Sequence, residues 1–257
     1  MDVQNLLERV TAIQRAHPND DFSRMTEVLQ NFAAGKTYES TIPFYDPRPA
    51  ELVYPGLSTP QPWHNTSVYP WIADLEAAYS TIKEEVWAKM GDPNISNQFE
   101  DYGVEVGDTS QWKVLSFKKH FQEIPDTIAD FPKTWEVLSK LPILSDCSIS
   151  VLEPGGIIEP HCDHYNFTLT THLSLSNPED CALKVGGVTN TWEEGKCFVF
   201  DHCFEHEGWN RSDQNRVVLI LNVWHFDLNE AEKAAILSVL QDFQNYYSAQ
   251  RALEAES

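Results

Sequence analysis

Residues 159–175 read EPHCDHYNFTLTTHLSL, and the second half of this stretch alternates polar and apolar side chains. A period of two is typical of a β-strand with one polar and one apolar face. Further short runs lie on both sides: CSISVL at 147–152, CALKV at 181–185, KCFVF at 196–200 and RVVLILNVW at 216–224. Turn signals lie between them: Gly155 with Gly156, Asn177 with Pro178, and Gly186 with Gly187. Short strands separated by turns predict an antiparallel β-sandwich or jelly roll.

Helical periodicity flanks this region, most clearly over residues 71–90 and again over 130–140. Seven prolines between residues 36 and 70 leave little room for helix and predict an extended, wrapped segment. We therefore expect one α+β domain with a β-dominated core over residues 1–257. Its parts are N-terminal helices (1–36), a wrapped segment with support helices (37–145), a jelly-roll core (146–228), and a C-terminal helix and tail (229–257).

The charge balance bears on the partners. Among 257 residues, 39 are Asp or Glu and 18 are Lys or Arg, which gives a formal net charge of −21. Such a surface repels phosphate backbones and anionic lipid, so we expect neither nucleic acid nor a membrane as partner. The N-terminus lacks a signal-peptide pattern, and the five cysteines show no CxxC spacing. These observations predict a cytoplasmic protein.

His161 and Asp163 form the sharpest chemical pattern. In an extended segment residues i and i+2 point to one face, which presents an imidazole and a carboxylate together. A third ligand would complete a two-histidine, one-carboxylate triad, which suits Fe(II) and leaves coordination positions open. Six of the nine histidines lie between residues 161 and 225, and His202, His206 and His225 are candidates for the third ligand. On its own, the HxD pair is also compatible with a plain polar pair at a strand end.

Arg216 favours His206 among these candidates, because it stands ten residues later at the head of an apolar strand. A buried arginine needs an anionic partner. The far carboxylate of a dicarboxylic co-substrate would supply one through bidentate contacts. The alternative is a structural ion pair with Asp201 or Glu205. Given the HxD pair and a distal histidine together, we favour the co-substrate.

Polar side chains on the predicted strands mark a cavity. His172 belongs to the polar face of the strand at 167–175, and Ser150 on the neighbouring run can donate a hydroxyl hydrogen bond. Strand alternation and an aromatic residue upstream of the core give four candidate substrate-binding residues: Trp112, Thr170, Asn222 and Trp224.

Three segments resemble the aspartyl/asparaginyl β-hydroxylase family of Fe(II)- and 2-oxoglutarate-dependent oxygenases. They are EPHCDHYNFTLTTHLSL (159–175), TWEEGKCFVFDHCFEHEGW (191–209) and RVVLILNVWHFDL (216–228). Weaker similarity appears in YPGLSTPQPW (54–63), YPWIADLEAAY (69–79) and GDTSQWKVLSF (107–117), so the resemblance covers about residues 50–230. It implies a double-stranded β-helix, a jelly-roll or cupin-like core, with helices stacked on its larger sheet.

The resemblance also implies roles for single residues. His161 and His206 match the family's iron-binding histidines. Arg216 matches its arginine for the distal 2-oxoglutarate carboxylate, and Ser150 matches a serine that helps there. His172 matches a histidine near the co-substrate.

Asp163 and Thr170 depart from the members that hydroxylate aspartyl and asparaginyl side chains. Those members have a glycine at the first position, so the full triad is restored here, and an arginine at the second. They also carry a helical-repeat domain and a membrane anchor, which this sequence does not show. The resemblance therefore points to the compact members, which often hydroxylate small molecules, rather than to peptide β-hydroxylation.

We expect a dioxygenase that uses Fe(II), 2-oxoglutarate and O2 to hydroxylate a small molecule, an amino acid or another natural product, and that releases succinate and CO2. Asp163 disfavours halogenation, whereas desaturation and ring formation stay open. One alternative is a non-catalytic jelly-roll binding protein. The other is a cupin metalloenzyme that needs no 2-oxo acid.

Overall fold

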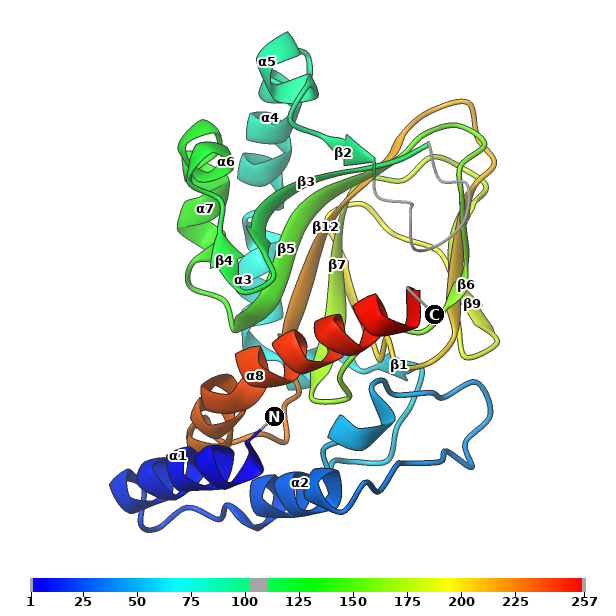
Figure 1. Cartoon of the computed structure of the whole chain (residues 1–257). Helices are drawn as coiled ribbons and strands as arrows, with labels where there is room; N and C mark the ends of the chain where they lie inside the picture. The colour runs from blue at the N-terminus through cyan, green and yellow to red at the C-terminus, as the bar shows by residue number, and fades with distance from the viewer. Residues whose placement is uncertain (1, 102–110, 256–257) are drawn as a thin grey trace. The chain divides into compact units, whose positions relative to one another are not determined.

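The computed structural model describes residues 2–101 and 111–255, so part of the weak similarity at 107–117 lies outside the described residues. The chain forms two compact units (Figure 1). We call residues 1–39, 48–59 and 226–257 the helical unit, and residues 40–47 and 60–225 the sheet unit.

The sheet unit confirms the predicted jelly roll. Eight antiparallel strands are divided between two sheets, with the order β10-β7-β12-β5 at the centre of the larger sheet and β6-β11-β8-β9 in the smaller one. Their bounds are β5 (Ile143–Leu152), β6 (Ile157–His161), β7 (Thr168–Ser176), β8 (Cys181–Val185), β9 (Val188–Asn190), β10 (Cys197–Phe200), β11 (His206–Asn210) and β12 (Arg216–Trp224). Eight strands divided between two packed antiparallel sheets are what define this architecture.

The larger sheet extends further at both edges. Strand β1 (Trp63–His64) pairs with β10, and β3 (Trp112–Lys119) pairs with β5. Two short strands, β2 (Glu100–Asp101) and β4 (Gln122–Glu123), pair with β3. The sequence analysis assigned no strand upstream of residue 147. In WKVLSF, Val114 and Leu115 are both buried, so the simple polar–apolar alternation is missing.

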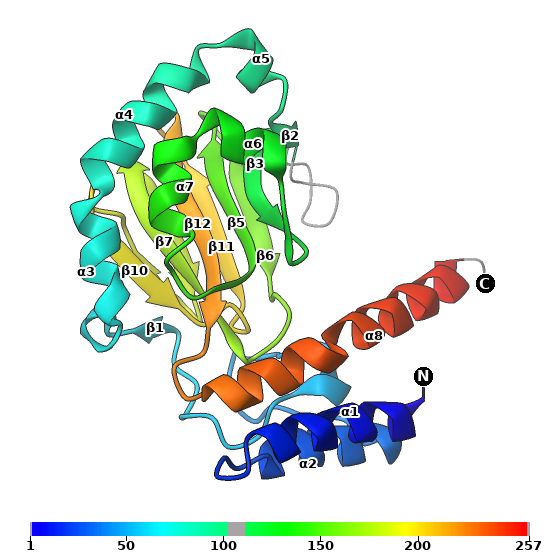
Figure 2. The same ribbon diagram turned by 90° about the vertical axis from the view of Figure 1, so that its left-hand side faces the viewer.

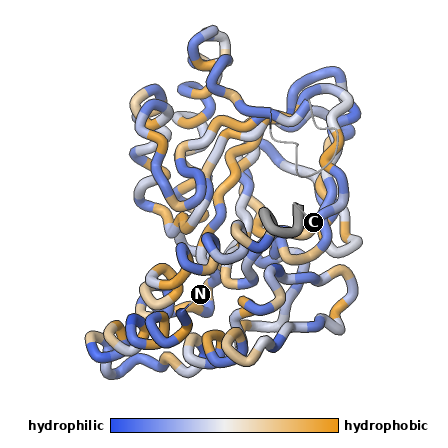
Figure 3. The backbone as a smooth tube through the Cα atoms, viewed as in Figure 1, coloured by the Kyte–Doolittle hydropathy of each residue, from blue (hydrophilic) through white to orange (hydrophobic). Residues whose placement is uncertain are grey.

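Helices cover one face of the larger sheet (Figure 2). They are α3 (Pro70–Ala77), α4 (Tyr79–Met90), α6 (Pro125–Asp130) and α7 (Pro132–Leu138), with the short α5 (Pro93–Ser96) after α4. Leu75 and Ile82 on the helices pack with Ile149 and Leu219 on the strands in one buried cluster. Hydrophobic residues recur along these strands (Figure 3), and burying them is the main favourable term in forming this layer.

The single helix that the periodicity predicts over residues 71–90 is wrong in one respect. Ala78, with φ −82° and ψ −4°, separates α3 from α4. The apolar stripe still stays on one side, because Leu75 and Ile82 are seven residues apart, which is about two helical turns.

In the helical unit, α1 (Val3–Ala16) and α2 (Ser23–Ala33) pack with α8 (Glu230–Ala255), and the short 3-10 turn η1 (Ala50–Leu52) contacts α2. A charged cluster is buried here. Arg24 donates to both carboxylate oxygens of Glu232 at 2.7 and 2.6 Å, and the Tyr54 hydroxyl donates to the same carboxylate at 3.0 Å. Within residues 2–101 and 111–255, no helix is both long and apolar enough to cross a membrane.

Candidate functional site

His161 and His206 face each other across the smaller sheet. They are partners in the β6–β11 register, and their ring centroids lie 4.2 Å apart. A register shift separates this pair from the next, Gly208 with Ile158, so β6 carries one extra residue before His161. Such a β-bulge re-aims the side chains beyond it. Here it turns His161 to the same face as His206.

Both imidazoles are held in the same way. The Nδ1 atom of His161 bonds the carbonyl oxygen of Glu159 at 2.7 Å, and Nδ1 of His206 bonds that of Phe204 at 2.9 Å. A carbonyl oxygen only accepts, so each Nδ1 carries the proton and donates it. In the neutral form of the ring, each Nε2 then keeps its lone pair, which is the state a metal ligand requires.

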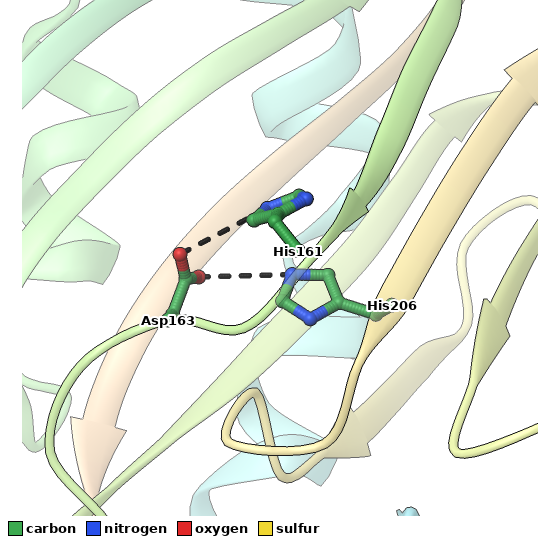
Figure 4. A group of neighbouring side chains, drawn as sticks. All are labelled: His161, Asp163 and His206. Atoms are coloured by element: carbon green, nitrogen blue, oxygen red, sulfur yellow. Dashed lines mark ion pairs between the residues drawn. The ribbon is translucent and has the colours of Figure 1, made fainter. Parts of the chain in front are cut away.

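Asp163 lies in the loop after β6 rather than on the strand. Its backbone N–H donates to the carbonyl oxygen of His202 at 2.9 Å, which ties the loop to the β10–β11 connection. The carboxylate oxygens lie 3.9 Å from Nε2 of His161 and 3.7 Å from Nε2 of His206 (Figure 4). The side chain is 46 % exposed, so the group is open on one side.

The electrostatics of the cluster keep it in a ligand-ready state. Burial lowers the pKa of His206 to about 4, so its imidazole is neutral at physiological pH. Burial acts to raise the pKa of Asp163, but the imidazoles of His206, His202 and His161 outweigh it and hold that pKa below its ordinary value. The neutral imidazole of His206 and the carboxylate of Asp163 are thus in the states in which they can bind a metal ion.

These three side chains fit a single metal ion. Their ligand atoms all lie within 4.8 Å of one another, and they form the one such His/Cys/Asp/Glu group found in the described part of the chain. Two atoms that each bond an ion at about 2.1 Å lie at most about 4.2 Å apart, so separations of 3.7 and 3.9 Å are compatible with one ion. Two histidines and a carboxylate suit Fe(II).

The other two histidines considered as ligands lie outside this group. The ring of His202 lies behind Asp163, with Nδ1 4.0 Å from a carboxylate oxygen. His225 faces the ring of His64 instead, with centroids 6.2 Å apart.

Arg216 lies on the inner face of the larger sheet, opposite Leu152 in the β12–β5 register. Its side chain is among the most buried in the structure, at 1 % exposure. Within residues 2–101 and 111–255 the guanidinium has no carboxylate partner, and its Nε has no hydrogen-bond acceptor. Burial lowers its pKa to about 10, so it stays charged at neutral pH. The structural ion pair with Asp201 or Glu205 is therefore not formed.

Ser150 and His172 share the inner face with Arg216. Ser150 is fully buried, and its Oγ accepts the Nε1–H of Trp112 at 2.9 Å. His172 lies opposite Ile220 of β12, and its Nδ1 is 3.3 Å from Nε1 of Trp192. Sequence reasoning placed Trp112 near a substrate, whereas its indole supports Ser150.

Thr170 and Asn222 contact each other rather than standing free. They are partners in the β7–β12 register, and the Thr170 hydroxyl lies 3.1 Å from Asn222 Oδ1 and 2.8 Å from Nδ1 of His202. The other ring nitrogen of His202 lies 2.9 Å from the Thr168 hydroxyl. Trp224, on the same face, lies 6.4 Å from the ring of Phe167 and stays partly exposed.

Sequence reasoning assigned no role to Trp192 and set His202 aside as a ligand. Both contact predicted site residues only because the sandwich closes. Trp192 belongs to the segment TWEEGK, which was quoted only for its resemblance to the family. The polar side chains of the strand at 167–175 were the one indication in the sequence that buried hydrogen-bond partners such as these were needed.

A jelly roll that gathers two histidines and an aspartate beside a buried arginine is typical of the cupin and hydroxylase class of folds. The chain belongs to the aspartyl/asparaginyl beta-hydroxylase family, whose sequence model matches residues 76–226. The resemblance stated above is confirmed.

Two curated relatives illustrate the range of the family. The ornithine lipid ester-linked acyl 2-hydroxylase of Rhizobium tropici is 32 % identical over 177 residues, covering 66 % of this chain and 63 % of that protein. The human aspartyl/asparaginyl beta-hydroxylase is 30 % identical over 189 residues, covering 70 % of this chain and 24 % of that protein. The match thus spans less than two thirds of either relative.

Solved structures with similar strands include a Pseudomonas putida prolyl-4-hydroxylase, with 13 % identity, 60 % of this chain and 98 % of that chain covered, and a TM-score of 0.37. The cupin domain of Schizosaccharomyces pombe Cnp3 has 10 % identity, covers 45 % of this chain and 66 % of that chain, and has a TM-score of 0.31. The assignment of the fold rests on strand order and register. The family match is the basis for the hydroxylase activity proposed for this chain.

Proposed function

We propose that this chain is an Fe(II)- and 2-oxoglutarate-dependent oxygenase that hydroxylates a small molecule. The observation that carries the proposal is Arg216, a charged side chain at 1 % exposure with no carboxylate partner among the described residues. A buried charge of this kind is costly unless an anion accompanies it. The distal carboxylate of 2-oxoglutarate fits, because a guanidinium binds a carboxylate through two parallel hydrogen bonds.

His161, Asp163 and His206 would hold the iron. Three protein ligands leave positions open for a chelating 2-oxo acid and for O2. When bound, the iron and 2-oxoglutarate together supply the activation of O2, with release of succinate and CO2. The carbonyl contacts of Glu159 and Phe204 keep both imidazoles oriented with Nε2 toward the ion.

Ser150 would assist Arg216 as a second donor. Its Oγ already accepts a hydrogen bond from the Trp112 indole, which can only donate. The serine's own hydrogen is therefore left for another acceptor, and a carboxylate oxygen suits that role.

The substrate we propose is an amino acid, an amino-acid derivative or another natural product. The side chains of Thr170 and Asn222 are hydrogen-bonded to each other, which leaves them less available to a substrate. Trp224 is therefore the strongest of the sequence-derived candidates for substrate contact. The Rhizobium tropici relative favours a second class, the acyl chain of an ornithine lipid. A cytoplasmic location remains a prediction from the cysteine pattern.

The test is succinate formation from 2-oxoglutarate by protein loaded with Fe(II) under anaerobic conditions and then given O2. Wild type is compared with Asp163→Ala and Arg216→Ala, and with Arg211→Ala as a control, because the exposed Arg211 lies over the partly exposed Trp209 ring. We expect succinate from wild type and the control only. Wild type without succinate production, and without a thermal shift on adding 2-oxoglutarate, would support the cupin alternative. Binding without turnover, also with amino-acid and ornithine-lipid candidates present, would support the binding protein.

A further inference from the structure

Trp192 precedes β10 and contacts two side chains that the proposed function assigns to 2-oxoglutarate. Its Nε1–H donates to Nδ1 of His172 at 3.3 Å, and the two rings are parallel within 6°, with centroids 6.1 Å apart. The central carbon of the Arg216 guanidinium lies 5.1 Å from the centroid of the same indole. At 6 % exposure, Trp192 is buried with both partners.

We propose, building on the proposed function, that Trp192 is a positioning residue for the co-substrate, which fixes His172 as an Nε2–H donor and holds the Arg216 guanidinium in place through a cation–π contact. Neither the family match nor the sequence pattern gives this tryptophan a role.

The tautomer of His172 follows from the chemistry of its partner. An indole N–H donates and cannot accept, so Nδ1 of His172 must supply a lone pair. A neutral imidazole carries one proton, which must then sit on Nε2. Burial, followed by the nearby charge of Arg216, lowers the pKa of His172 well below its ordinary value, which keeps the ring neutral.

This tautomer matters because the neighbouring ligand is an anion. An Nε2–H can donate to a carboxylate oxygen, whereas the opposite tautomer would present a lone pair to it and repel it. The ring cannot easily turn to compensate, since Phe198 and Phe200 pack against it with centroids 5.2 and 5.3 Å away.

The contact with Arg216 places the guanidinium carbon over the face of the Trp192 indole, 5.1 Å from its centroid. A cation is attracted to the face of an indole. A cation–π contact uses none of the five N–H donors of the guanidinium, so they stay available for a carboxylate. The indole thus replaces the counter-charge that the described residues do not provide.

The first experiment reads the tautomer directly, by two-bond ¹H–¹⁵N correlation of the His172 ring in the metal-free wild-type chain. The proposal expects the proton on Nε2, and finding it on Nδ1 overturns the proposal. This measurement needs no substitution at Trp192, so it decides even where a variant folds poorly.

The second experiment compares Trp192→Phe and Trp192→Leu with the matched control Trp209→Phe, whose indole lies 4.9 Å from Arg211 on the exposed side of β11. Loss of the N–H predicts a KM for 2-oxoglutarate about threefold to tenfold higher in Trp192→Phe. Loss of the ring as well predicts a larger rise in Trp192→Leu. We expect kcat at saturating 2-oxoglutarate and Fe(II) affinity to stay within about twofold of wild type, because Trp192 contacts no metal ligand.

The outcomes separate the two proposals. A wild type that does not bind 2-oxoglutarate overturns the proposed function and, with it, the co-substrate role of Trp192. A wild type that binds 2-oxoglutarate, with an unchanged KM in Trp192→Phe and Trp192→Leu, overturns the role of Trp192 alone. A KM that rises equally in Trp209→Phe does the same, because it would mark a general loss of stability.

Discussion

Two arginines, the partly buried Arg24 in the helical unit and the fully buried Arg216 in the sheet unit, have opposite surroundings. Arg24 in the helical unit bonds both carboxylate oxygens of Glu232, and Tyr54 completes the cluster. Arg216 in the sheet unit is more deeply buried and has an indole face but no carboxylate. The helical unit satisfies its charge internally, as a structural element must. The sheet unit leaves its charge for a ligand, and this difference separates a stabilising ion pair from a binding residue.

The largest expected effect is on the paired arginine. Arg24→Ala leaves Glu232, 1 % exposed, as a buried carboxylate without a cation, and should lower the free energy of unfolding by about 3–5 kcal/mol. Urea unfolding followed by circular dichroism measures it. Arg9→Ala removes the surface ion pair with Asp242 and should cost about 1 kcal/mol or less. Equal losses in the two variants would contradict the distinction.

The unpaired arginine should behave in the opposite way. Arg216→Met removes a buried charge that no carboxylate balances, so the free energy of unfolding should stay level or rise slightly. Binding of 2-oxoglutarate should weaken by about a hundredfold or more, because a charge-assisted bidentate contact is lost. Calorimetric titration and urea unfolding of the same samples give both numbers. A large loss of stability with unchanged binding would make Arg216 structural, like Arg24.

Asp201 is a buried acidic side chain to which the same comparison of buried charges applies. It is buried with one backbone N–H as donor, and burial raises its pKa to about 6. The folded state therefore holds a proton that the unfolded chain releases near pH 4. The stability contribution of Asp201 is full below pH 4 and is lost as pH rises to 6, by about 2–3 kcal/mol. Unfolding free energies of wild type and Asp201→Asn between pH 4 and 7 measure it, and their difference should change by that amount.

The smallest effect concerns the hydroxyl that bonds His202. Thr170→Val keeps the shape of the strand and removes the contacts to His202 and Asn222, at a cost of about 1 kcal/mol. Thr171→Val is the matched control, because the Thr171 hydroxyl is buried without a hydrogen-bond partner. Thermal unfolding of both variants tests it. A control that loses as much stability as Thr170→Val would argue against a specific role of this bond.

Much of this architecture is predictable from the sequence, because alternation over 147–224 depends on local pattern alone. The three residues of the metal group are predictable from the sequence, but the backbone conformation that brings them together is not. His161 and Asp163 meet through a bulge and a loop rather than through plain i, i+2 alternation. Trp192 and His202 were beyond reach, since their partners lie 20 or more residues away and depend on how the two sheets close. The residue types in the sequence indicate which ligands are present. Which other side chains contact those ligands depends on how the two sheets pack together.

The extra residue in β6 makes the spacing of the chain itself a determinant of the site. From Gly208 to His206 strand β11 advances by two residues, whereas its partner β6 advances by three, from Ile158 to His161. The extra residue, within Glu159 and Pro160, therefore decides to which face of the sheet the side chain of His161 points. No substitution scan would reveal this, because every side chain nearby can be exchanged while the spacing stays intact. Removing a single residue there would turn an imidazole to the outer surface and leave the composition of the site unchanged. The length of this segment therefore matters to the site as much as the identity of the histidines.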